Sequence, residues 1–237
     1  MDNKSLLEKL QKFTEYVKEF VKYNKSDVED IHRLRVSSRE LYSLMSNDTP
    51  FHKQIKKVIK LSNKVRDLDV FFEVYLESLP KEFIEKLDLE TILESTNRSR
   101  NKDIDKLHLY LKYLEVPQNL EFKYEVKEFD YSKIEVLKYN QEELHKYRIY
   151  IKKNLAKEKN SFPLNKKKVK LLSTIKDLLG TINDYNNGIK RLETYDIEAT
   201  LFKKIDYFTQ EQNAILFKEF IIINKKYLDF KSKENIQ

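Results

Sequence analysis

Side chains that can bind an anion occur twice in this sequence at the same spacing. The two sets are His32, Arg35 and Arg39, and then His145, Arg148 and Lys152. On a helix the offsets of 0, 3 and 7 keep each set within about 60° of arc. Arginine binds phosphate oxygens bidentately and lysine binds them as a point charge. Each set therefore predicts a cationic row on one helix face, and the two rows are 113 positions apart.

Further lysines accompany both rows. Lys53, Lys57, Lys60 and Lys64 fall within about 60° of one another on a predicted helix. Four like charges on one face repel each other, which favours a polyanion as partner, with an ordinary solvated face as the alternative. Near the second row, Lys159 continues the spacing and Lys153 and Lys170 add charge.

The composition favours long helices. Two Gly and four Pro in 237 residues leave few helix breakers. There is no Cys, which excludes disulfides, thiolate chemistry and Cys-based metal sites. The 46 basic and 39 acidic residues give a net charge of +7.

The beginning of the chain is charged, and no apolar run approaches the length of a membrane span. We therefore expect a soluble cytoplasmic protein with no membrane partner.

The second occurrence of the row indicates an internal repeat. A second alignment places Asn63 over Gly180 and Asp67 over Asp184, at an offset of 117. We therefore predict an all-α fold of two tandem four-helix bundles, related by an internal pseudo-twofold repeat. The first repeat would occupy residues 1–116 and the second residues 131–237, within one domain spanning 1–237. Residues 117–130 would form a connector, in which 120–130 alternate like a strand.

Local signals place the ends of several helices. Ser26 and Glu29 form a predicted capping box before the helix that carries His32. Thr49 and Pro50 mark the start of the lysine-bearing helix. Gly180 is expected to end or bend a helix of the second repeat.

Four motifs in this order resemble the CHAD domain, an all-helical family that binds inorganic polyphosphate. They are H-x-x-R-V-x-x-R at His32–Arg39, R-D-L-D-V at Arg66–Val70, H-x-x-R-I-x-I-K-K at His145–Lys153 and L-G-x-x-N-D at Leu179–Asp184. The resemblance covers residues 5–230. It implies two four-helix bundles around a basic groove or pore, along which polyphosphate is bound.

The sequence departs from that family in two places. Glu40 stands where a second basic residue usually follows Arg39. The second repeat also lacks the lysine stripe, because Thr174, Asp177 and Thr181 replace lysines of the first repeat. Either the binding surface is lopsided, or lysines at the start of the same helix substitute. Those lysines are Lys166, Lys167 and Lys170.

We expect a binding protein without catalysis, cofactor or metal. No Walker loop is present, the nearest approach to an E-x-E-x-K strand lacks its first Glu, and the four His are widely spaced. An RNA- or DNA-backbone-binding protein is the alternative, and a helical scaffold for an acidic protein is a third. The histidines would either contact the ligand or serve as structural hydrogen-bonding groups. The candidate polyphosphate-binding residues are His32, Arg35, Arg39, Lys53, Lys57, Lys60, Lys64, His145, Arg148, Lys152, Lys153, Lys159 and Lys170.

Overall fold

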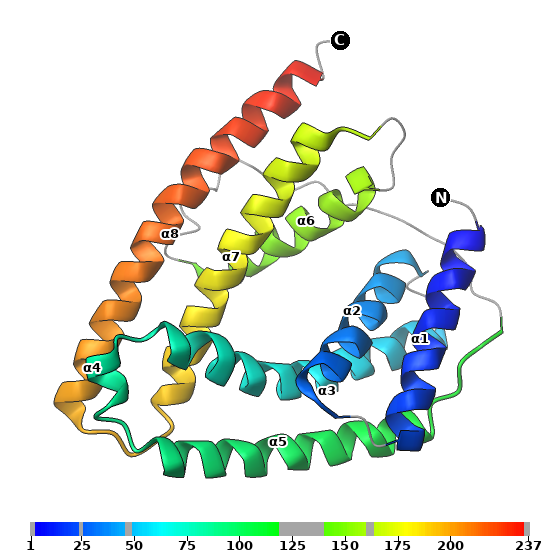
Figure 1. The fold of residues 1–237 in the computed structure, drawn as a ribbon. Coiled ribbons are helices and arrows are strands. Elements are labelled where there is room, and N and C mark those ends of the chain that lie inside the picture. The colour runs from blue at the N-terminus through cyan, green and yellow to red at the C-terminus, as the bar shows by residue number, and fades with distance from the viewer. Residues whose placement is uncertain (1–2, 24–25, 46–48, 119–139, 160–163, 235–237) are drawn as a thin grey trace. The chain divides into compact units, whose positions relative to one another are not determined.

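The computed structural model describes residues 3–23, 26–45, 49–118, 140–159 and 164–234. Within these ranges all the regular elements are helices, so the predicted all-α class is confirmed (Figure 1). None of the described helices is long and apolar enough to cross a membrane. The chain divides into two compact units, Met1–Glu125 and Val126–Gln237.

The first unit is built on four long helices with shorter elements between the third and the fourth. In chain order its elements are α1 (Asn3–Tyr23), α2 (Val28–Leu44), α3 (Pro50–Val70), the π-helical turn η1 (Phe71–Leu76), α4 (Lys81–Ile84) and α5 (Leu89–Lys112). Helix α1 packs on α2, α2 on α3, α3 on α5, and α5 back on α1. These helices pack together because apolar residues recur every three and four positions along them. Leu10, Phe13 and Val17 of α1 are an example, and all three are buried.

The start of α2 differs from the prediction by one residue. The N-cap is Asp27, whose side chain accepts a hydrogen bond from the backbone N–H of Asp30 at 2.7 Å. The capping box assigned to Ser26 was therefore wrong. A carboxylate at this position both caps the helix and compensates its positive end, which a serine hydroxyl does less well. The predicted start of α3 is confirmed, because Thr49 caps the helix and Pro50 is its first residue.

The second unit contains α6 (Gln141–Lys159), α7 (Lys166–Leu192) and α8 (Ala199–Glu234) in its described residues. Helix α7 packs against both α6 and α8. Gly180 does not end α7, which continues for another three turns. A single glycine inside a helix costs about 1 kcal/mol, and the burial of Leu178, Leu179 and Ile182 around it offsets that cost. The strand-like segment 120–130 lies outside the described residues.

Helix α6 is held in a fixed rotation by a buried hydrogen bond. The Tyr147 hydroxyl donates to Oδ1 of Asn224 in α8 at 2.5 Å, and both side chains are buried. Burial raises the pKa of the Tyr147 hydroxyl, so this group stays protonated and remains a donor. Because Tyr147 points inward, the neighbouring Arg148 lies at the margin of the core.

Candidate functional site

The first predicted row lies on α2, beside its buried face. Ile31, Leu34 and Leu41 of α2 are fully buried in the core of the first unit. The row residues His32, Arg35 and Arg39 are all half-buried. Helix α2 packs against α3, and the two arginines reach across to that helix.

One side-chain oxygen of α3 holds both arginines of the row. Arg35 donates its Nε–H to Oδ1 of Asn63 at 2.7 Å. Arg39 donates an Nη2–H to the same Oδ1 at 3.0 Å. A carboxylate is the commoner partner for a half-buried guanidinium, whereas the amide of Asn63 is neutral. Asn63 thus orders both guanidinium groups without adding a charge of its own.

The imidazole of His32 lies in positively charged surroundings. Its pKa is lowered mainly by burial, and then by the nearby charges of Arg66 and Arg35, while Glu29 acts in the opposite direction. Arg66 of α3 also forms an ion pair with Glu73 at 3.2 Å. Protonation of His32, which would add a third positive charge to the row, is therefore unfavourable in the free protein. A bound anion would make this protonation less unfavourable.

The lysine stripe of α3 is exposed as predicted. Lys53, Lys57, Lys60 and Lys64 are all exposed, and Ile55, Val58 and Val65 on the other side of the helix are buried. The stripe does not act as one row, however. The ammonium of Lys57 lies 4.5 Å from the centre of the Tyr110 ring on α5, a cation–π contact that directs this lysine toward α5.

Glu40, the acidic residue beside Arg39 in the sequence, is paired elsewhere. Its carboxylate accepts from Lys9 of α1 at 2.8 Å. Adjacent positions on a helix differ by about 100° in direction, so Glu40 faces α1 while Arg39 faces α3. This departure from the CHAD pattern therefore places a negative charge beside α1, away from the Asn63 side of the row.

The second row lies on α6 and has a different partner. His145 is exposed, and Arg148 and Lys152 are half-buried. A Cβ atom built on Gly180 of α7 would lie 3.5 Å from Nη2 of Arg148, so the guanidinium lies over this glycine. In the repeat predicted from the sequence, Arg148 aligns with Arg35 and Gly180 aligns with Asn63. Each pair is in contact within its own unit.

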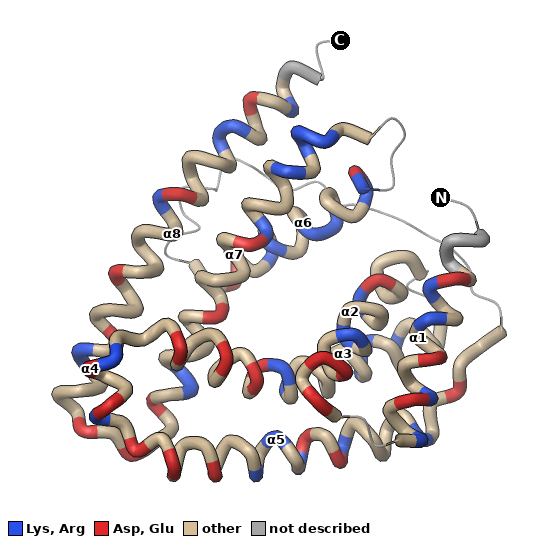
Figure 2. Tube along the Cα trace, viewed as in Figure 1, with Lys and Arg blue, Asp and Glu red and all other residues tan. Residues whose placement is uncertain are grey.

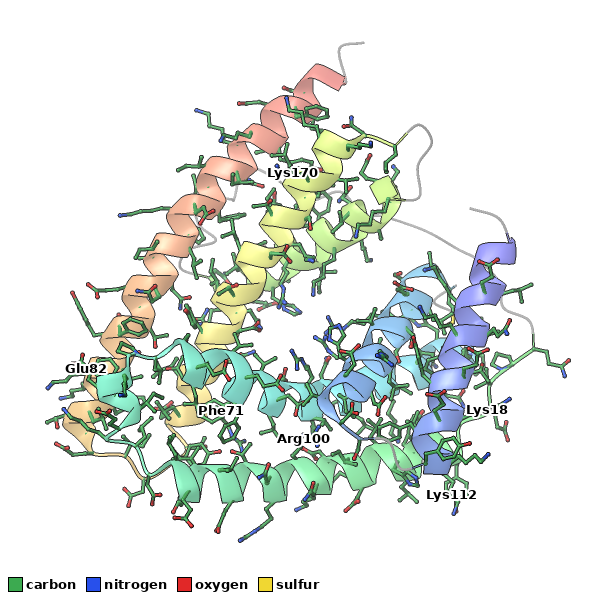
Figure 3. The ribbon with its side chains drawn as sticks, in the orientation of Figure 1. Lys18, Phe71, Glu82, Arg100, Lys112 and Lys170 are labelled. Atoms are coloured by element: carbon green, nitrogen blue, oxygen red, sulfur yellow. The ribbon has the colours of Figure 1, made fainter. Side chains whose placement is uncertain are left out.

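The other predicted lysines of the second unit lie around the beginning of α7 and the end of α6. Figure 2 shows positive charge gathered at the start of α7, where Lys170 is exposed and labelled in Figure 3. Lys159 is also exposed and Lys153 is half-buried. Lys168 pairs with Glu158 at 2.8 Å, with both side chains largely covered, so it joins α7 to α6.

In the predicted repeat, two threonine hydroxyl groups of the second unit align with lysines of the first unit. Thr174 donates to the backbone carbonyl of Lys170, and Thr181 donates to that of Asp177. These side chains are engaged with their own helix. The lysines and arginine predicted for the site in the second unit therefore lie on α6 and in the first turns of α7.

The remaining two histidines have structural positions. His52 is buried and stacks on Tyr42, with ring centroids 4.1 Å apart. A ring nitrogen of His108 lies 3.2 Å from the carbonyl oxygen of Val21. No cluster of three His, Asp or Glu side chains arranged to hold a metal occurs in the part of the chain that the structure describes.

The predicted site omitted three residues: Asn63 and Arg66, which interact with the α2 row, and Lys56, which lies on the Asn63 side of α3. Asn63 was noted only for its place in the repeat. Lys56 is exposed and lies seven residues before Asn63, which places it within about 20° of Asn63 on the helix. Lys56 could have been predicted from knowledge of which side of α3 faces α2. The regular spacing of the four stripe lysines drew attention to a neighbouring face instead.

The chain matches no protein-family model, no curated protein and no solved structure. Its fold and its surface define a helical protein with an arginine-containing row on α2 and a related row on α6.

Proposed function

We propose that this protein binds inorganic polyphosphate, without catalysing a reaction, through the α2 row and the α6 row. The observation that carries the proposal is the pairing of Arg35 with Asn63 and of Arg148 with Gly180. The repeat found in the sequence aligns these residues with each other. A cationic side chain kept in the same position in both copies is best explained by a ligand with repeating charge.

Polyphosphate fits these rows because it consists of charged phosphate groups alone. It has no base or sugar to be recognised, so a binding protein needs closely spaced cations on a rigid support. Residues three and four apart on a helix supply such spacing, about 5 Å along the axis. Arginines add bidentate hydrogen bonds to the phosphate oxygens.

The same correspondence supports the finer fold proposal, a CHAD-like domain of two tandem four-helix bundles related by a pseudo-twofold. Helices α2 and α3 of the first unit would correspond to α6 and α7 of the second. Helix α2 packs against α3, and helix α6 packs against α7. The difference in chemistry between Asn63 and Gly180, and between the lysine stripe and the two threonines, would make the first copy the more strongly charged surface.

Binding of RNA or DNA is the alternative function. It would be expected to use aromatic rings as stacking platforms for bases. Many of the large aromatic side chains are instead fully buried in the two cores, among them Tyr75, Tyr147 and Tyr227. This distribution favours a ligand without bases.

The proposal is tested by removing both rows at once. A variant with Arg35, Arg39, Arg148 and Lys152 all changed to Gln keeps polar side chains of similar length and removes four charges. We expect long-chain polyphosphate binding to fall at least 100-fold in a fluorescence titration, since charge-assisted contacts contribute roughly 1.5–3 kcal/mol each. Thermal unfolding followed by circular dichroism checks that the variant is folded.

A control variant removes the same number of charges from other surfaces. Lys81, Lys102, Lys203 and Lys218 are exposed on α4, α5 and α8, two in each unit, and are changed to Gln. This variant has the same net charge as the first one and is expected to bind within about threefold of the wild type, because single charges on an exposed surface contribute little individually. Equal losses in both variants would show that net charge alone attracts the ligand and would overturn the proposal.

A further inference from the structure

We propose that exposed lysines of α3 form a track that continues the α2 row and makes the protein prefer long polyphosphate chains to short ones. This role rests on the proposed function and goes further, because it assigns a preference for chain length to a surface of α3. The track consists of Lys60, Lys56 and Lys53, in order of increasing distance from Asn63. Three features of α3 support it: the composition of its exposed face, the directions of the lysines, and their spacing along the helix.

The exposed face of α3 is almost entirely basic. Its exposed residues are Lys53, Lys56, Lys57, Lys60, Lys64 and Asp67. No Asp or Glu occurs between Phe51 and Arg66, so the helix itself supplies no carboxylate within one turn of the track. Among the residues that the structure describes, none forms an ion pair with Lys53, Lys56 or Lys60. An anionic ligand therefore meets three ammonium groups on this face.

Contacts on either side of α3 define the direction of each lysine. Asn63 bonds to the arginines of α2, so its direction marks the side of α3 that faces α2. Lys57 makes its cation–π contact with α5 and marks the side that faces α5. From the direction of Asn63, Lys56 points about 20° away, Lys60 about 60° and Lys53 about 80°, all in the same sense of rotation. Lys57 points about 120° away in that sense. The track therefore lies on the α2 side of the exposed face.

The spacing of the track along α3 suits a chain of phosphates. Its lysines lie three, seven and ten positions before Asn63. With a rise of about 1.5 Å per residue, they are about 4.5, about 10 and about 15 Å from Asn63 along the helix axis. A polyphosphate bound at the α2 arginines can therefore continue along α3 and meet one ammonium group about every 5 Å. Tripolyphosphate, with three phosphates, fills the arginine end and leaves Lys53 without a phosphate.

The gain from the track depends on the length of the ligand. Lysine binds phosphate as a compact point charge on a flexible stem, and one exposed contact adds little by itself. Contacts to one continuous chain add up, because each contact holds the following phosphates close to the next lysine. A long chain gains from the arginines and from the whole track, whereas a short chain gains from the arginines and their nearest neighbours. The preference for length follows from this difference.

The test compares two variants of equal net charge. K53Q/K56Q removes the two lysines of the track that lie furthest from Asn63. The matched control, K57Q/K102Q, removes the adjacent lysine that faces α5 and an exposed lysine of α5 itself. Tripolyphosphate and long-chain polyphosphate are titrated against the full-length wild type and both variants at two salt concentrations. Thermal unfolding followed by circular dichroism checks that each protein is folded.

We expect K53Q/K56Q to bind long-chain polyphosphate about tenfold more weakly than the wild type and tripolyphosphate within about threefold, since the long chain alone loses two contacts. Its slope of log affinity for the long chain against log salt should be shallower by about 0.7 for each lost contact. K57Q/K102Q should bind both ligands within about threefold of the wild type. Each ligand is compared with itself between proteins, so the larger number of binding positions on a long chain cancels.

Equal losses of long-chain affinity in the two variants, or no loss in K53Q/K56Q, would overturn the role of the track. The same fold-loss for both ligands in K53Q/K56Q would overturn the preference for length. Either result concerns the track alone, provided that the four-residue Gln variant has lost long-chain polyphosphate. A wild type that does not bind polyphosphate, or a four-residue Gln variant that binds it normally, would overturn the proposed function and the role of the track with it.

Discussion

His32 is the residue of the α2 row whose charge depends on pH. In the folded protein its pKa lies below the ordinary value of 6.5, because burial and the charges of Arg66 and Arg35 disfavour the proton. The unfolded chain therefore takes up this proton first as the pH falls. The stabilising effect of a neutral His32 is complete above pH 6.5 and is lost as the pH falls toward the lower folded value.

The expected result is that wild-type stability decreases between pH 7 and pH 5 by more than the stability of an H32Q variant does. Glutamine keeps hydrogen-bonding capacity and does not titrate in this range. Urea unfolding at several pH values measures the difference. If H32Q and wild type respond identically to pH, His32 has no shifted pKa.

Polyphosphate binding should respond to pH in the opposite direction. An anion beside His32 favours the protonated imidazole, so binding takes up a proton and becomes tighter below pH 6.5, by at most about tenfold per pH unit for one proton. Titrations at pH 6 and pH 8 test this. An unchanged affinity, or the same change in H32Q, would remove His32 from direct charge pairing with the ligand.

Among the helices, α7 is notable for continuing through Gly180. The backbone there is helical, and among the described residues beyond its own stretch of helix, an added Cβ would meet Nη2 of Arg148 at 3.5 Å. That distance is an ordinary van der Waals contact. A methyl group therefore fits without displacing α6.

We expect the G180A variant to be more stable than the wild type by about 0.5–1 kcal/mol, since alanine in a helix interior avoids the entropy cost of glycine. Urea unfolding measures the change. Polyphosphate affinity should stay within twofold, because the guanidinium of Arg148 keeps its place. A destabilised G180A would mean that Arg148 must lie closer to the α7 backbone than it does here.

Helices α3 and α5 are joined by an ion pair at the edge of the first core. Arg100 of α5, labelled in Figure 3, donates its Nε–H to Oδ1 of Asp69 at 2.6 Å. It also donates an Nη2–H to the carbonyl oxygen of Ser26, just before α2 begins. The Asp69 side chain is 2% exposed, and the guanidinium of Arg100 compensates its charge within the protein.

The R100A variant should lose about 3 kcal/mol of stability, because it leaves a buried carboxylate without its cation. The R100M variant should also be destabilised. The double variant R100M/D69L should recover much of that stability, since an apolar pair of similar size avoids the desolvation cost. Urea unfolding of the single and double variants measures both effects. Equal destabilisation of R100M and of R100M/D69L would show that the orphaned carboxylate of Asp69 is not the cause of the loss.

At the scale of the whole chain, the sequence predicted what depends on periodicity. Apolar spacing placed α1, α2, α3 and α6, and the cationic offsets placed the two rows on α2 and α6. The contacts of Arg35 with Asn63 and of Arg148 with Gly180 were not predicted. What it did not predict depends on packing between helices. Asp27 rather than Ser26 caps α2. Lys57 turns to Tyr110, which is 53 positions away in the sequence.

The use of Asn63 as a common acceptor also has a consequence for the rate of binding. Long-range attraction sets how often an anionic chain meets the surface, and this attraction depends on uncompensated positive charge. Asn63 adds no charge of its own and so does not alter that attraction. Since the two guanidinium groups already stand in place, little rearrangement follows the encounter. Association with the α2 row should therefore be fast and strongly dependent on ionic strength, with the lifetime of the complex set by how well the ligand's charges fit the pair.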